Sequence, residues 1–272
     1  MVEYIFIFLF GSCVGSFLNV IFYRFPLGKS FIYSQSACTS CNQKIQFRDN
    51  VPIISWLFLG GKCRFCKCKI SVTYPLVELI TALSWLSISL LNPISTQAFE
   101  ANLAYIFNCF LISIIIIIFY FDCKYLWIPK FSLDLLLFSG IIFLLLKLTT
   151  GLISAKIFMF YIFFYFLFFS AFELIRKLGK YFYKKEVLGK GDTYIVASNA
   201  LLIGLKGNLL ALLITFVLAS FLEILTRLIN KNVKTNQFAL GPYLLIGLLI
   251  VWTFGFNPIW TKWQIFITNI FI

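Results

Sequence analysis

The chain has 272 residues, of which 61% are hydrophobic and 12% charged, with a mean hydropathy of +0.95 and a formal net charge of +13. Soluble domains average roughly 25% charged residues, so this composition excludes an ordinary soluble protein and indicates a chain that crosses a membrane several times. Because the chain has no histidine, any catalysis must use Asp, Glu, Cys, Ser, Lys or Tyr, and any metal site must depend on cysteine.

Apolar segments predict an all-α polytopic membrane protein with about eight transmembrane helices. The segments are 3–23, 76–92, 102–121, 131–147, 154–175, 193–205, 208–229 and 240–257. The sixth is too short to cross ~30 Å at 1.5 Å per residue, so we expect it to be partial or joined to the next helix through Gly204 and Gly207. Small residues in the first segment, such as Gly11 and Gly15, are spaced to let another helix approach closely. That segment is too polar in its middle to be a removable signal peptide.

The distribution of Lys and Arg predicts the orientation of these segments, because both residues prefer cytoplasmic loops. With the N-terminus outside, eight crossings place four polar segments in the cytoplasm: 24–74, 122–130, 176–192 and 230–239. With their flanks, these segments carry 19 of the 23 Lys and Arg residues. The positive charge is therefore mostly a topological signal, and we expect no nucleic-acid partner.

The first polar segment contains two C-x-x-C pairs, Cys38 with Cys41 and Cys63 with Cys66, separated by 21 residues. Each pair can supply two thiolates to one tetrahedral zinc ion. Reducing conditions in the cytoplasm disfavour disulfides, and a metal explains how about 50 residues with little core can fold. We therefore predict a small cytoplasmic zinc-binding domain after the first helix. Cys68 is a fifth candidate that could replace Cys66, and the alternatives are unligated cysteine pairs or a redox pair.

Two aspartates are predicted to lie at the same depth of the membrane. Asp192 ends the Gly189-Lys190-Gly191-Asp192 stretch and begins an apolar segment, and Asp122 ends the third span. An ionised acid in hydrocarbon is costly unless it faces a polar cavity, pairs with another group or takes part in chemistry. The alternative is that both are solvated loop acids, Asp122 being paired with Lys124 or Lys130.

An ordered set of motifs across nearly the whole chain resembles the type IV prepilin peptidases, membrane aspartyl proteases of the GxGD type. The matching stretches are Gly15-Ser16-Phe17-Leu18-Asn19-Val20 with Tyr23-Arg24 and Pro26; the two C-x-x-C pairs; Asp49-Asn50-Val51-Pro52 with Ser55-Trp56; Ile70-Ser71 with Tyr74-Pro75-Leu76-Val77-Glu78; Asp122 with Ile128-Pro129; Glu186 with Gly189-Lys190-Gly191-Asp192; and Gly241-Pro242-Tyr243.

The resemblance implies that Asp122 and Asp192 are catalytic. Because glycine lacks a side chain, we expect Gly189 and Gly191 to let the substrate backbone approach as an extended strand. It implies cleavage of the basic leader of type IV prepilins and pseudopilins after a Gly, at the cytoplasmic face of the bacterial inner membrane. In many members, S-adenosylmethionine then methylates the new N-terminus. The implied partners are these substrates and membrane lipid, and the implied cofactors are a structural zinc ion and S-adenosylmethionine.

The expected domains are a first transmembrane helix over 1–23, a cytoplasmic four-cysteine domain associated with methylation over 24–74, and a transmembrane peptidase domain over 75–272. The chain departs from the family pattern in carrying Thr193-Tyr194 where many members have a Lys, in its extra Cys68, and in lacking Pro within the first C-x-x-C. The alternatives are a peptidase without methylation, a proton-coupled transporter that uses the two aspartates, and a non-enzymatic factor for pilus or secretion assembly. No residues that bind S-adenosylmethionine are predicted.

Overall fold

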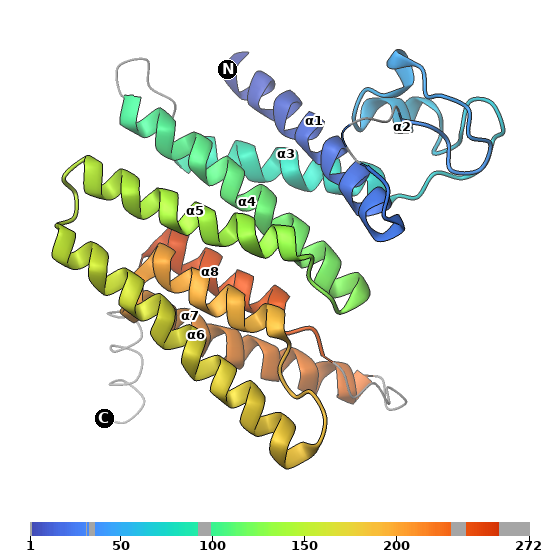
Figure 1. Cartoon of the computed structure of the whole chain (residues 1–272). Coiled ribbons are helices and arrows are strands. Elements are labelled where there is room, and N and C mark those ends of the chain that lie inside the picture. Colours follow the sequence, from blue (N-terminus) through green and yellow to red (C-terminus); the bar gives the residue numbers. More distant parts are fainter. Residues whose placement is uncertain (1, 31, 33–35, 92–98, 230–237, 256–272) are drawn as a thin grey trace. The chain divides into compact units, whose positions relative to one another are not determined.

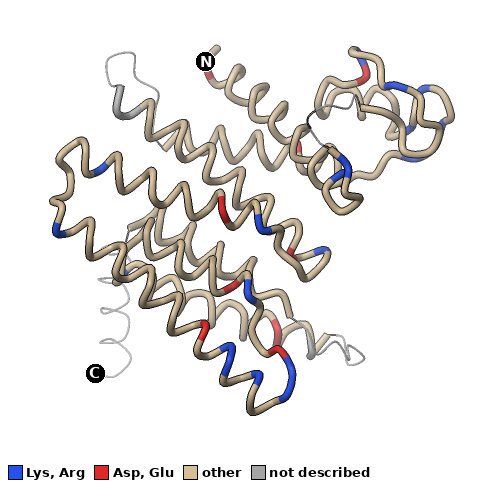
Figure 2. Tube along the Cα trace, in the orientation of Figure 1, with Lys and Arg blue, Asp and Glu red and all other residues tan. Residues whose placement is uncertain are grey.

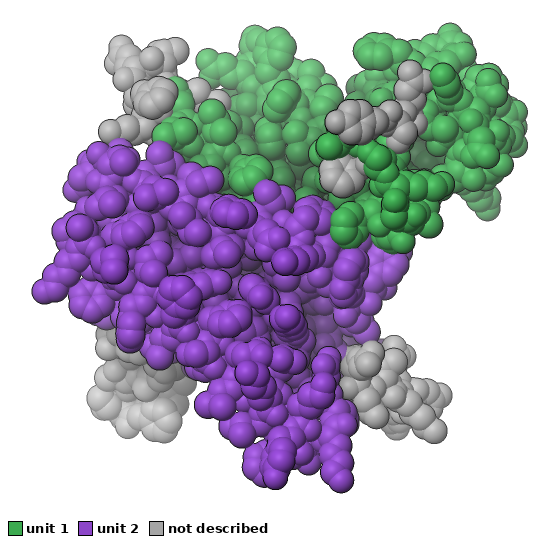
Figure 3. Space-filling view, in the orientation of Figure 1, with its two compact units in different colours: residues 1–117 green, residues 118–272 purple. Residues whose placement is uncertain are grey.

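The computed structural model describes residues 2–30, 32, 36–91, 99–229 and 238–255 (Figure 1). These residues form helices and loops, with two isolated β-bridges and no strand, which confirms the predicted all-α fold. Six of the described helices are long and apolar enough to cross a membrane. The chain divides into two compact units, residues 1–117 (unit 1) and 118–272 (unit 2), coloured separately in Figure 3.

Unit 1 is built on the packing of α1 (Val2–Arg24) against α3 (Thr73–Leu91), which lie side by side (Figure 1). A Cβ atom at Gly15 would lie 2.6 Å from the Glu78 Cα, and one at Gly11 would lie 3.0 Å from the Ala82 Cα. Glycine at these positions therefore lets the two backbones touch, as the spacing of small residues predicts.

The segment between α1 and α3 has short helical turns and long loops: η1 (Phe25–Leu27), η2 (Phe47–Asp49) and α2 (Ile54–Phe58). It carries many basic residues, as Figure 2 shows. Two hydrogen bonds of 2.6 and 2.7 Å join the Arg64 guanidinium to the Asp49 carboxylate. The Trp56 indole Nε1 donates to the Ile70 carbonyl at 3.2 Å. Cross-links of this kind fix loops that bury little apolar surface.

Unit 2 contains the last turns of α4 (Phe99–Tyr125), α5 (Lys130–Thr149), α6 (Ala155–Tyr183), α7 (Lys190–Ile229) and α8 (Gly241–Phe254). Helix α7 packs against α5, α6 and α8, so it is the centre of the unit. Glycines again mark the closest approaches. A Cβ at Gly140 of α5 would meet Leu201 of α7 at 2.9 Å, and one at Gly247 of α8 would lie 2.5 Å from the Ala211 carbonyl oxygen of α7.

Helix α7 is broken at Gly204, where φ is 69° and ψ is −176°. The Asn208 side-chain amide donates to the Val196 carbonyl at 3.1 Å, although residues twelve apart in a continuous helix are separated by roughly 18 Å. The chain therefore folds back into two antiparallel arms, 190–203 and 205–229 (Figure 1).

This break agrees with the prediction that the short sixth segment joins the next helix through Gly204. With two arms in α7, the described residues contain eight apolar helices, one for each predicted segment. The last two residues of the predicted 240–257 segment and most of the 230–239 loop lie outside the described residues.

Large apolar side chains remain exposed along the helices. On α6, for example, Phe160, Phe163 and Phe166 are 50%, 57% and 62% exposed. Apolar surface of this extent is unusual on a soluble monomer, whereas hydrocarbon solvates it well. The exposed faces therefore agree with a protein that lies in a membrane.

We expect Gly15→Ala to separate α1 from α3, because the added methyl group would overlap the backbone at Glu78. Overpacking of this kind costs about 1–3 kcal/mol. The measurement is the unfolding free energy of the purified protein in detergent. Cys13→Val is the matched control, since Cys13 is on the exposed face of the same helix. Equal stability of Gly15→Ala and the wild type would contradict the close packing.

Candidate functional site

Asp122 lies in the last turn of α4, and its carboxylate is held by the start of α8. The helix ends at Tyr125, and the next residue, Leu126, has a φ of 52° and an amide that donates to the Asp122 carbonyl at 3.0 Å. The Asp122 side chain is only 6% exposed, and its Oδ2 accepts a hydrogen bond from the Gly241 amide at 3.0 Å. Gly241 is the first residue of α8, so its amide has no partner within the helix and is suited to an anion.

Asp192 is the third residue of α7 and is 8% exposed. Its carboxylate lies against Gly189, where a Cβ atom would be 2.9 Å from the Asp192 Oδ2. The charge of Asp122 acts on this carboxylate, so the two acids are electrostatic neighbours. Both carboxylates therefore lie at the start of a helix and within one site.

Ile128 connects the two halves of this site. A Cβ at Gly191 would lie 2.8 Å from the Ile128 Cδ1, and a Cβ at Gly241 would lie 3.4 Å from the same atom. Ile128 thus contacts the glycine before Asp192 as well as the glycine that binds Asp122. The end of α4 and the starts of α5, α7 and α8 all meet here.

The loop that leads into Asp192 is fixed on α6 by charge pairs. Glu186 lies 3.3 Å from Lys180 and 3.9 Å from Arg176, and Arg176 also binds Glu173 at 2.7 Å. Figure 2 shows these charges gathered at the end of α6 and in the loop that follows. Surface pairs are individually weak, but together they restrict the path of the loop.

The structure brings Asp122 and Asp192 together, although they are seventy residues apart in the sequence. It gives Gly189 and Gly191 a steric reason, because they contact Asp192 and Ile128; their exposure to a substrate stays a prediction. No pattern of charge or spacing in the sequence indicates a role for Gly241 or Ile128. Their places in the motifs shared with the prepilin peptidases are the one signal that points to them.

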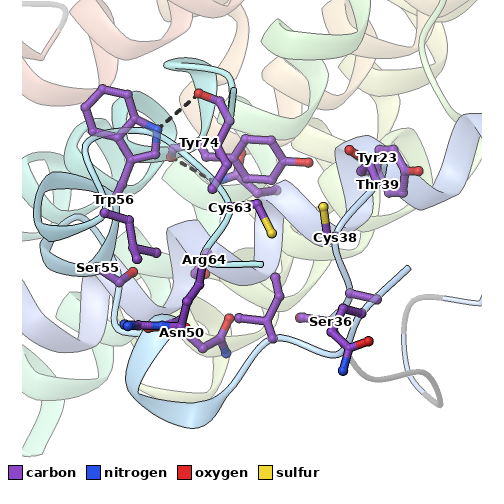
Figure 4. A pocket seen from close by; sticks show the side chains of 18 of the residues that line it. Tyr23, Ser36, Cys38, Thr39, Asn50, Ser55, Trp56, Cys63, Arg64 and Tyr74 are labelled. Atoms are coloured by element: carbon purple, nitrogen blue, oxygen red, sulfur yellow. Dashed lines mark hydrogen bonds and ion pairs between the residues drawn. The ribbon is translucent and has the colours of Figure 1, made fainter. Parts of the chain in front are cut away.

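The predicted metal ligands form a second cluster, in unit 1. The sulfur atoms of Cys38, Cys41, Cys63 and Cys66 all lie within 4.8 Å of one another. In a tetrahedral site with metal–sulfur bonds of about 2.3 Å, the sulfur atoms lie about 3.8 Å from one another. The sulfur–sulfur distances in this cluster are of that order, so the set can hold a metal ion. Figure 4 shows two of the four, Cys38 and Cys63, next to each other.

The two C-x-x-C turns have the same backbone pattern. The Cys38 amide donates to the Gln43 carbonyl at 3.0 Å, and the Cys63 amide donates to the Cys68 carbonyl at 2.9 Å. Cys68 therefore closes its turn as Gln43 closes the other. Its sulfur also lies 3.6 Å from that of Cys38 and 3.2 Å from that of Cys66, beside the four-cysteine set.

Backbone amides within each turn favour the thiolate form of its first cysteine. Hydrogen bonds from the amides of Cys41 and Ser40 lower the pKa of the Cys38 thiol to about 6. The amides of Cys66 and Phe65 likewise lower the pKa of Cys63. The thiolate is the form that binds metal, so the backbone of each turn favours its first cysteine as a ligand.

Two family models match the parts of the chain in which the two clusters lie. A model of the bacterial peptidase A24 N-terminal domain matches residues 9–91, and a model of the type IV leader peptidase family matches residues 109–224. The "Type 4 prepilin-like proteins leader peptide-processing enzyme" of Escherichia coli O78:H11 (strain H10407 / ETEC) is 32% identical over 263 residues, covering 87% of this chain and 88% of the relative. The chain belongs to the type IV leader peptidase family.

Other members of the type IV leader peptidase family are similar over most of their length. The "Prepilin leader peptidase/N-methyltransferase" of Pectobacterium carotovorum subsp. carotovorum is 29% identical, covering 87% of this chain and 88% of the relative. The protein with the same name from Aeromonas hydrophila is 27% identical, covering 97% and 93%. No solved structure matches the chain.

We expect the purified protein to contain about one bound metal ion per chain, because four thiolates converge on one point. Cys41→Ser should reduce the metal content and should make residues 36–71 more sensitive to limited proteolysis. Atomic emission spectrometry measures the ion. Cys13→Ser is the control, since Cys13 lies on α1 away from the cluster. Full metal content in Cys41→Ser would exclude Cys41 as a ligand.

Proposed function

We propose that this protein cleaves the leader of type IV prepilins and pseudopilins with Asp122 and Asp192, and then methylates the new N-terminal amine. The main support is the pair of buried carboxylates, each held at a helix start and each within the electrostatic field of the other. The names of the family and of the relatives support the substrate and both reactions.

In the proposed cleavage, the two carboxyl groups share one proton, because two like charges at close range do not both ionise readily. The deprotonated group takes a proton from water as the water oxygen attacks the scissile glycyl carbonyl carbon. The protonated group donates a hydrogen bond to the carbonyl oxygen and then protonates the leaving amine as the C–N bond breaks. The pair titrates as a unit, so neither aspartate is given a fixed role.

The Gly241 amide has a specific part in this mechanism. It donates to the Oδ2 of Asp122, which leaves the other oxygen to face water or substrate. Gly189 leaves the Asp192 carboxylate accessible in the same way, because any side chain at this position would press on that carboxylate. The helix starts thus orient both acids, and Gly189 and Gly191 leave room for an extended substrate backbone.

We propose that the site lies at the cytoplasmic face of the bacterial inner membrane. The basic residues at the end of α6 and in the loop after it (Figure 2) come directly before α7, whose first turn contains Asp192. Lys and Arg concentrate on the cytoplasmic side of membrane proteins. The apolar helix of the substrate would then lie among the spans, with its leader junction at the surface.

The other half of the proposal assigns methylation to the cysteine-rich region. We assign residues 1–23 to the first span, 24–74 to a cytoplasmic domain that supports methylation, and 75–272 to the peptidase. The ion in the four-cysteine set is proposed to be zinc with a structural role, because four cysteines leave no open coordination position. S-adenosylmethionine, when bound, supplies an electrophilic methyl group for the amine that cleavage exposes.

We expect Asp122→Asn and Asp192→Asn each to lower kcat/KM for prepilin cleavage by about 100-fold to 10,000-fold, because an amide cannot exchange the proton. The assay uses purified protein in lipid nanodiscs and a prepilin that retains its apolar helix. Asp134→Asn is the matched control, since Asp134 lies on α5 of the same unit. Near-normal cleavage by either variant would rule out Asp122 and Asp192 as the catalytic pair and would favour a role for the protein as a non-enzymatic assembly factor.

We expect Gly241→Ala and Gly189→Ala to lower cleavage strongly, because the new methyl group would press on the carboxylate of Asp122 or Asp192. Gly140→Ala is a sharp control. Its methyl group would lie 2.9 Å from Leu201, the same distance as that from a Cβ at Gly189 to Asp192, but would touch neither aspartate, so stability should fall while kcat in the folded fraction is retained. Equal activity of all three variants would mean that the glycines do not position the acids.

A further inference from the structure

Unit 1 contains an open cavity of about 590 Å³, lined by the end of α1, the cysteine-rich segment and the first turns of α3 (Figure 4). Cavities that bind small molecules or cofactors typically measure about 300–1,000 Å³. All residues that line this cavity belong to unit 1, whereas Asp122 and Asp192 belong to unit 2. The cleavage chemistry therefore gives this cavity no role.

Two carboxylates line the cavity, and they differ in their charge balance. Asp49 is neutralised by Arg64 through two hydrogen bonds. Glu78 is 7% exposed, and its Oε2 accepts the Ile53 amide at 2.7 Å. Among the described Lys and Arg residues, none forms an ion pair with Glu78. A buried carboxylate without a counter-charge is unfavourable, so a ligand that brings a positive charge would be stabilised here.

The loop beside Glu78 is strained. Ile53 has a φ of 62° and a ψ of −56°, a conformation that β-branched residues rarely adopt. The hydrogen bond from its amide to Glu78 holds it there. Strain of this kind persists where surrounding structure enforces it, and it is concentrated at functional sites. Glu78 thus lines the cavity and also holds Ile53, the residue that precedes α2.

The remaining walls supply flat aromatic surfaces and basic groups. Tyr23 from α1, Trp56 from α2 and Tyr74 from α3 line the cavity from different elements (Figure 4). Aromatic rings stack on nucleobases and attract cations through their faces. Lys44 and Lys69 also line the cavity and can bind a carboxylate. The cavity therefore suits a zwitterionic ligand that carries a purine.

We propose that this cavity binds S-adenosylmethionine, with the purine against the aromatic side chains and a positive charge of the methionyl end facing Glu78. This ligand carries a purine, a carboxylate and two cationic groups, the ammonium and the sulfonium. The purine, the carboxylate and one of the two cationic groups each have a counterpart in the wall. The inference rests on the methyl-transfer half of the proposed function and adds the residues that hold the donor.

The test is equilibrium binding of radiolabelled S-adenosylmethionine to the full-length protein in lipid nanodiscs. Glu78→Gln removes the charge but keeps an oxygen that can accept the Ile53 amide, and Tyr23→Leu removes one aromatic wall. Each should weaken binding by at least about 10-fold. Glu3→Gln is the control for Glu78→Gln, and Tyr4→Leu is the control for Tyr23→Leu. Both control residues lie on α1 and outside the cavity lining, so these variants should bind within about 2-fold of the wild type.

Metal content and unfolding temperature show whether each variant is folded, so weaker binding by a folded variant supports the assignment. Normal binding by both Glu78→Gln and Tyr23→Leu, with binding by the wild type, would overturn the assignment to this cavity and leave the proposed methylation standing. No binding by a wild type that cleaves prepilin would instead overturn the methyl-transfer half of the proposed function, and the cavity assignment with it.

Discussion

The organisation of unit 2 depends on one requirement: two carboxylates buried in an apolar bundle must be given hydrogen-bond donors. The start of α8 meets this requirement for Asp122 through the Gly241 amide, and Asp192 lies in the first turn of α7. Unpaired amides at a helix start are donors that need no polar side chain, so a site made from them adds little polarity to the membrane interior. The two acids can therefore be buried and still remain available for chemistry.

The chain separates its chemistry between the two units. In unit 1, the cysteine turns, the cavity and Glu78 are all fixed by loops and by the packing of α1 on α3. In unit 2, the acids depend on helix ends and on glycines without room for a side chain. Each unit has the means of stabilisation suited to its surroundings: four cysteines that can hold a metal ion where apolar burial is small, and close helix packing where the helices are apolar.

The sequence predicted the features that leave a local pattern. Paired C-x-x-C spacing predicted which four cysteines lie together, and the depth of two acids in the topology linked Asp122 to Asp192. The Gly241 contact was missed because it uses a backbone amide 119 residues from its acceptor, and every residue except proline has such an amide. Glu78 was quoted within a motif without a role, because its charge balance depends on side chains that only the folded chain brings near.

The reversal at Gly204 determines which end of the bundle each later helix starts from. A straight 40-residue helix would be roughly 60 Å long and would deliver the chain to the opposite end of unit 2. With the fold-back, the chain makes an outward and a return pass between Asp192 and Gly241, an even number. Only an even number lets α8 begin at the end where α4 finishes. A single glycine with positive φ thus sets an even number of passes and brings the Gly241 amide to the Asp122 carboxylate.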